Sequence, residues 1–151
     1  MFTIGAFAMI FDEQGRVLLC HPRDNDVWNL PGGGVESGEM PTEAVMREVM
    51  EETGLEVDIE RLVGVYGKIG KDEYVFSFVC RITGGSLYTS DDSIEYRYFE
   101  LDNLPSNTAP KHAERILDTL DVQDQPVFRR QTAQSTQEML KETRKRDNTQ
   151  S

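Results

Sequence analysis

The chain has 151 residues, a length that suits one domain with a buried core. Hydrophobic residues make up 38% of it, but no apolar run approaches the ~20 residues that a membrane-spanning helix needs, which argues against a membrane protein. The formal net charge is −11, and a body this acidic repels a phosphate backbone, which argues against nucleic-acid binding.

The first third of the chain predicts two strands and then a sharp turn. Residues 3–11 and 16–20 are rich in β-forming side chains, and the DEQG segment between them, residues 12–15, is typical of a hairpin turn. Three consecutive glycines follow at positions 32–34, where we expect the chain to turn sharply.

A helix is predicted over residues 41–53. Pro41 suits the first turn of a helix, and Gly54 suits the position just past its end. Val45 and Val49 fall on one stripe of this helix, so we expect that stripe to face the core.

The rest of the chain predicts further strands and a short helix before a polar tail. The strands are expected at residues 62–69, 74–82 and 95–101, and the helix near residues 111–120. Both faces of the strand at 74–82 are largely apolar, so it should be central and covered on both sides. We expect one α/β domain over residues 1–121, with a charge of −13, and a partly helical tail over residues 122–151, with a charge of +2.

The cysteine content and the start of the chain bear on the compartment. Cys20 and Cys80 are the only cysteines, too few for a disulfide framework or a cysteine-based zinc site. Each lies in an apolar run, so we expect two buried, inert thiols. The apolar start lacks a basic leader and is interpreted as a strand, not a signal peptide. We therefore expect the protein to be located in the cytoplasm.

Three acidic residues, Glu48, Glu51 and Glu52, lie at offsets of three and four on the predicted helix. At about 100° per residue they project within one arc of roughly 100°, next to the apolar stripe. Like charges at this spacing repel one another, which a divalent cation would offset. Oxygen ligands suit Mg²⁺ or Mn²⁺ better than zinc. For the helix alone, a solvated acidic face is the competing interpretation.

The residues around this helix follow a recognisable spacing. Gly33 is followed after five residues by Glu39, and after seven more by REVMEETGL at residues 47–55. This pattern resembles a complete Nudix box. The flanking WNLPGG at 28–33 and YRYF at 96–99 extend the likeness over about residues 3–120. The chain is identified as a member of the Nudix hydrolase family (MutT-like), whose fold is an α/β/α sandwich with a mixed β-sheet.

The resemblance implies a role for each matching residue. It assigns Mg²⁺ or Mn²⁺ binding to Glu48, Glu51 and Glu52, together with the Gly32 carbonyl. It implies that Arg47 and Glu39 pair with each other and orient those glutamates, which makes the catalytic set Glu51, Glu52, Arg47 and Glu39. One further acid outside the box often serves as a ligand or general base in the family. The candidates here are Asp92 and Glu95.

The resemblance also implies a reaction and a substrate class. In-line attack of water on phosphorus would cleave the pyrophosphate of a nucleoside diphosphate linked to another moiety, such as a nucleoside triphosphate or an ADP-ribose-like molecule. The expected partner is then a small-molecule nucleotide. For the oligomeric state, a homodimer is one alternative. The alternatives are a Nudix-fold module that binds or senses a nucleotide without cleaving it, although every acid of the box is retained, and a purely structural acidic domain, which explains neither the glycines nor Arg47.

Three aromatic residues and two histidines are further candidates for the site. Trp28, Tyr66 and Phe7 could stack on the base, but we expect core packing for each. His21 and His112 have no partner at a recognisable spacing, and we expect structural or surface positions for both.

Overall fold

The computed structural model describes residues 1–88, 94–120, 125–132, 141 and 144–145. Its elements in chain order are β1 (Thr3–Ile10), β2 (Val17–Pro22), β3 (Gly32–Gly34), α1 (Pro41–Thr53), β4 (Leu55–Lys68), β5 (Glu73–Gly85), β6 (Ile94–Phe99), α2 (Pro110–Asp118) and β7 (Val127–Gln131). Neither of these two helices has the length and apolar character needed to cross a membrane.

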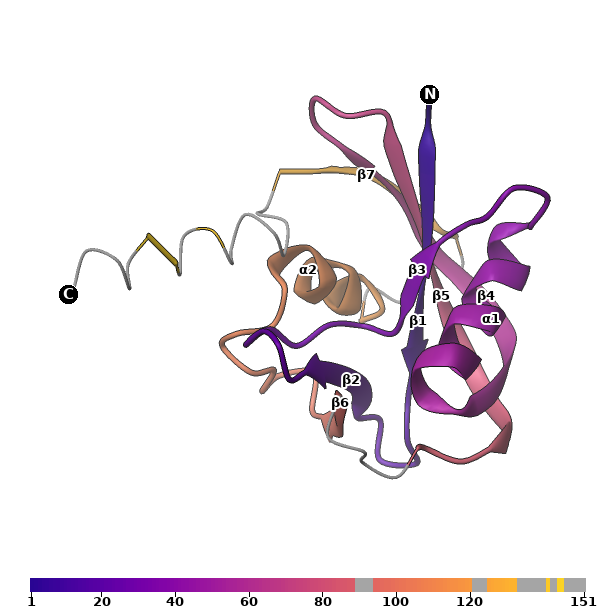
Figure 1. Cartoon of the computed structure of the whole chain (residues 1–151), viewed down its shortest axis with the longest axis vertical. Coiled ribbons are helices and arrows are strands. Elements are labelled where there is room, and N and C mark those ends of the chain that lie inside the picture. Colours follow the sequence, from indigo (N-terminus) through magenta and orange to yellow (C-terminus); the bar gives the residue numbers. More distant parts are fainter. Residues whose placement is uncertain (89–93, 121–124, 133–140, 142–143, 146–151) are drawn as a thin grey trace.

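Five strands form a mixed sheet in the order β3-β1-β5-β4-β7 (Figure 1). β1 runs antiparallel to β3 and parallel to β5, while β4 runs antiparallel to β5 and parallel to β7. β5 is therefore central, as its two apolar faces predicted. β2 and β6 pair with each other in a separate two-stranded antiparallel sheet.

The two helices cover opposite faces of the five-stranded sheet (Figure 1). Ala6 and Ala8 of β1 pack in one buried cluster with Val45 and Val49 of α1. Met9, which points to the other face of β1, packs in a second cluster around α2. The arrangement is an α/β/α sandwich with a mixed sheet, which confirms the predicted fold class.

The local signals at the ends of α1 predicted its bounds correctly. Pro41 occupies the first turn, where the missing N–H costs nothing, and Glu43 accepts a hydrogen bond from the Met40 N–H at 3.0 Å. Gly54 ends the helix with φ +82, and a Cβ at this position would lie 2.5 Å from the Ser86 carbonyl oxygen. Glycine is needed here for both its backbone conformation and its lack of a side chain.

The predicted hairpin of the first two strands is wrong in its pairing. The turn itself forms, because Asp12 accepts hydrogen bonds from the backbone N–H groups of Gln14 and Arg16, both at 2.9 Å. Next to this turn, a single bridge between Phe11 and Val17 connects the two strand segments. β1 pairs within the five-stranded sheet, whereas β2 pairs with β6.

Three segments differ from the predicted elements. The glycine run is a short strand, β3, paired to β1, and not the sharp turn expected there. β4 begins at Leu55, well before the predicted start at residue 62, and its ladder with β5 contains register shifts. β7 lies within the segment expected to be tail, and its last residue, Gln131, is buried.

Candidate active site

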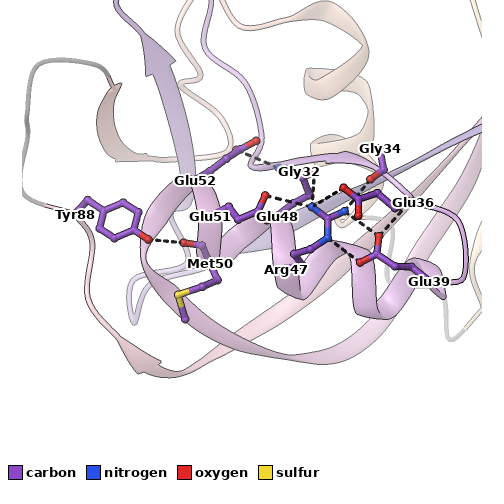
Figure 2. Close-up of polar contacts among 10 residues, drawn as sticks. All are labelled: Gly32, Gly34, Glu36, Glu39, Arg47, Glu48, Met50, Glu51, Glu52 and Tyr88. Atoms are coloured by element: carbon purple, nitrogen blue, oxygen red, sulfur yellow. Dashed lines mark hydrogen bonds and ion pairs between the residues drawn. The ribbon is translucent and has the colours of Figure 1, made fainter.

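Arg47 is the centre of the polar cluster at α1 (Figure 2). Its Nη1 donates to Glu48 at 3.1 Å and to Glu51 at 3.2 Å, and its Nη2 donates to the Gly34 carbonyl at 3.1 Å. One guanidinium thus offsets the negative charges of Glu48 and Glu51 and joins the helix to the glycine strand. This counter-charge explains how acids at adjoining helix positions are tolerated next to the core.

Glu39 holds the other side of the same guanidinium. Arg47 donates to it from Nε at 2.7 Å and from Nη2 at 2.9 Å, a two-point contact that fixes the guanidinium plane. The hydrogen bond from Arg47, and next the backbone N–H of Glu36, lower the pKa of Glu39 to about 2. The same contact raises the pKa of Arg47, so the pair stays charged over the physiological range. The contact expected between Arg47 and Glu39 is present.

Glu52 occupies a different environment from Glu48 and Glu51. It is partly buried, and its Oε2 accepts a hydrogen bond from the Gly32 N–H at 3.4 Å (Figure 2). Burial raises the pKa of Glu52 to about 7; the Gly32 contact lowers it, and the charges of Glu48 and Glu51 raise it. The protonation state of Glu52 therefore depends on pH near neutrality.

The glycines of β3 are needed because the strand lies close to other groups. A Cβ at Gly32 would lie 2.3 Å from the Ala6 carbonyl oxygen, and one at Gly33 would lie 2.6 Å from the carboxyl carbon of Glu48. A Cβ at Gly34 would meet nothing within 4 Å. Because Gly32 and Gly33 have no side chains, the backbone of β3 fits between β1 and the acidic residues of α1.

Comparison with known proteins identifies the family. The sequence profile of the NUDIX domain matches residues 1–120. The chain belongs to the Nudix family. Relatives include a MutT-like protein of Streptomyces ambofaciens, 35% identical over 80% of this chain and 79% of the relative. An ADP-ribose pyrophosphatase of Methanocaldococcus jannaschii is 40% identical over 64% of this chain and 61% of the relative. Among solved structures, the MutT Nudix hydrolase of Burkholderia pseudomallei has a TM-score of 0.65 and 27% identity, covering 78% of this chain and 98% of its own.

The chain is thus a Nudix hydrolase, as its box predicted, and α1 is its Nudix helix. Two tyrosines hold the last turn of this helix from outside the box. The Tyr88 hydroxyl donates to the Met50 carbonyl at 2.9 Å (Figure 2). The Tyr96 hydroxyl donates to the Glu52 carbonyl. From the sequence, Tyr96 was only part of the likeness to the family, and its contact with Glu52 could not be predicted because nothing local links position 96 to position 52.

Of the two candidates for a further acid, Asp92 and Glu95, the structure describes Glu95. Glu95 lies on β6 of the Nudix hydrolase opposite His21, and Arg97 contacts its carboxylate at 3.3 Å. Asp92 lies outside the described residues. Within the described part of the chain, no three acid, histidine or cysteine side chains are gathered closely enough to hold a metal ion. In this arrangement Arg47 engages Glu48 and Glu51 instead.

Three of the aromatic and histidine residues considered above lie in the interior of the Nudix hydrolase. Trp28 and Tyr66 are buried, as expected from core packing. His112 is buried too, so of the structural and surface positions expected for it the structural one is correct. Its Nδ1 accepts a hydrogen bond from the Leu30 N–H at 2.9 Å, and burial holds its pKa well below the usual range. A neutral ring therefore supports the strand segment that leads into β3.

Proposed function

We propose that this Nudix hydrolase uses Mg²⁺ or Mn²⁺ to cleave the pyrophosphate of a nucleoside diphosphate linked to another moiety, such as a nucleoside triphosphate or an ADP-ribose-like molecule. The observation that carries the proposal is the placement of Glu48, Glu51 and Glu52 on one side of α1, with Glu48 and Glu52 against the glycine strand. The ADP-ribose pyrophosphatase among the relatives supports the second substrate type.

The donor set fits a hard divalent cation. Glu48, Glu51 and Glu52 offer only carboxylate oxygens, and the Gly32 carbonyl would add another oxygen, which is the chemistry that Mg²⁺ prefers. When bound, the cation would neutralise the pyrophosphate and lower the pKa of a water molecule. We expect Glu48 and Glu51 to release Arg47 at least in part, since their carboxylates are engaged by it.

The protein side chains would then divide the remaining work. Arg47, held by Glu39, keeps Glu48 and Glu51 next to each other before the cation binds. Glu51 or Glu52 accepts the proton of the attacking water as it approaches phosphorus in line with the leaving oxygen. The environment of Glu52 makes its protonation state sensitive to pH near 7.

The test is a phosphate-release screen of nucleoside triphosphates and ADP-ribose-like dinucleotides, with and without Mg²⁺ or Mn²⁺. We expect divalent-dependent turnover and a kcat at least ~10²-fold lower for Glu52→Gln. Asp58→Asn is the matched control, because this exposed acid on β4 pairs with Arg81 and lies outside the cluster. Tight nucleotide binding without turnover would instead support a binding or sensor module.

A further inference from the structure

One end of the five-stranded sheet extends beyond α1 and exposes apolar side chains on the face that α1 covers elsewhere (Figure 1). Ala6 and Ala8 of β1 pack against α1, whereas Ile4, on the same face of β1, is exposed. Tyr74 of β5 pairs in register with Ile4 and is 45% exposed, and the ring of Phe2 stacks on it with the two centroids 5.5 Å apart. The described part of the chain therefore leaves this end of the sheet uncovered.

The same face continues across β4 to β7 at the edge of the sheet. Phe128 of β7 pairs in register with Val65 of β4, and Val65 pairs with Phe76 of β5, so the three side chains share this face. Phe128 is nevertheless 77% exposed. A groove of about 480 Å³ is lined by Phe128 and Tyr74, with Val65 and Gly67 among its other lining residues. The resulting apolar surface, the edge patch, consists of Phe2, Ile4, Val65, Tyr74 and Phe128.

The edge patch has the size of a protein–protein contact. Its two phenylalanines, its tyrosine and its isoleucine together expose on the order of 500 Å². Monomeric soluble proteins rarely expose a contiguous apolar patch of more than a few hundred Å². A stable interface buries roughly 800 Å² on each partner, so these four side chains would supply more than half of one. A second protein surface is therefore the occupant that fits the patch.

The strand at this edge also has free backbone groups. β7 pairs with β4 along its whole length, and among the described residues no strand pairs with its other side. An edge of this kind presents unpaired N–H and C=O groups to which another strand can bind. A strand from another molecule would satisfy these groups and cover Phe128 at the same time.

The charge of β7 favours a second copy of this chain as that molecule. The chain carries a net charge of −11, so two copies repel each other over most of their surface. The exposed Arg129 and Arg130 make β7 basic. Two copies that meet at β7 place these arginines between two acidic bodies, where attraction offsets part of the repulsion.

The sequence of β7 is also complementary to itself. Antiparallel pairing of two β7 strands about a twofold axis satisfies both free edges at once. Directly opposite residues share a face, so Phe128 lies opposite either Phe128 or Arg130 of the partner subunit, which gives an aromatic pair or a cation–π contact. Arg129 points to the other face, where its Nε donates to Asp118 at 3.1 Å, so its charge is already compensated.

We propose that two copies of this chain form a dimer by antiparallel pairing of their β7 strands, with the edge patch of each copy covered by the other and Phe128 at the centre of the contact. The two five-stranded sheets then form one continuous sheet. β3, which borders the acidic cluster, lies at the opposite edge from β7, so both acidic clusters stay accessible. The dimer is therefore independent of whether the protein hydrolyses nucleotides.

Sedimentation equilibrium of the full chain at concentrations up to about 100 μM measures this association, because weak interfaces of standard size have micromolar Kd values. We expect a monomer–dimer equilibrium whose Kd is at least ~tenfold weaker in Phe128→Lys, which replaces the apolar anchor by a positive charge beside the arginines of β7. Ile82→Lys is the matched control. Ile82 is also an exposed apolar residue of the sheet, but it pairs with Val57 outside the edge patch, so the Kd should be unchanged.

Cross-linking identifies the strands in contact. Positions 128 and 129 are those at which antiparallel β7 strands bring a residue opposite its own counterpart, each in one of the two registers. Phe128→Cys or Arg129→Cys should therefore form a disulfide between copies under mild oxidation, and Ile82→Cys should not. The native Cys20 and Cys80 are buried, so they leave the background low.

Two outcomes overturn the proposal. A wild type that is monomeric throughout the concentration range leaves the edge patch to the C-terminal tail or to a different protein. A dimer that persists in Phe128→Lys and gives no cross-link at either position of β7 places the contact between copies elsewhere on the chain.

Discussion

Replacing Glu52 by Gln should stabilise the metal-free protein, and more so at alkaline pH. Burial raises the pKa of Glu52 from 4.5 to about 7, so in this pH interval the folded state holds a proton that the unfolded state has lost. Stability therefore falls as pH rises through the interval, by about 1.4 kcal/mol per pH unit, which makes the full loss roughly 3 kcal/mol. Gln cannot ionise and avoids this loss while it still offers an oxygen to the Gly32 N–H.

Urea unfolding in EDTA at pH 5.5 and pH 8.5 measures the effect. We expect the gain of Glu52→Gln over the wild type to be larger at pH 8.5 by about 2 kcal/mol. Glu51→Gln is the control: this side chain is 59% exposed and contacts Arg47, so its replacement should change stability by similar amounts at both pH values. An equal change for Glu52→Gln at both pH values would refute the argument that burial governs this carboxyl.

Three further results are expected. Gly33→Ala should lower kcat with little loss of stability, because its Cβ would displace the Glu48 carboxylate. Gly34→Ala is the control: its Cβ would have no neighbour within 4 Å, so kcat and stability should be unchanged in parallel assays. Mg²⁺ should raise the melting temperature of the wild type but not of Glu48→Gln/Glu52→Gln, and equal shifts would place the cation elsewhere. Ending the chain at residue 132 should preserve activity, whereas a cut that also removes β7 should lower the melting temperature, since that strand pairs with β4.

The features that could be predicted from sequence are those with local causes. Pro41 and Gly54 delimit α1 through backbone preferences that act at those positions. The spacing of the three glutamates along one helix also fixes their shared side, whatever the helix packs against. The central position of β5 could be predicted because the apolar residues on both of its faces lie within one continuous segment of the sequence.

The features that could not be predicted depend on distant parts of the chain. β3 pairs with β1 through backbone groups, and glycines carry no side-chain pattern from which a strand could be recognised. β2 leaves β1 because β6, far along the sequence, offers it a partner. The raised pKa of Glu52 comes from burial beside Gly32, and helix periodicity contains no information about it.

The hydrogen bond from Tyr96 to the Glu52 carbonyl makes the acidic cluster responsive to a part of the molecule that carries none of its acids. Tyr96 belongs to the two-stranded sheet, whereas the Nudix helix rests on the five-stranded one. A shift of the small sheet against the large one would move the backbone of Glu52. The pKa of Glu52 depends on how deeply its carboxyl is buried, so it would change with that movement. Substitutions in β2 or β6 can therefore alter the pH profile of this enzyme without touching a single acidic side chain.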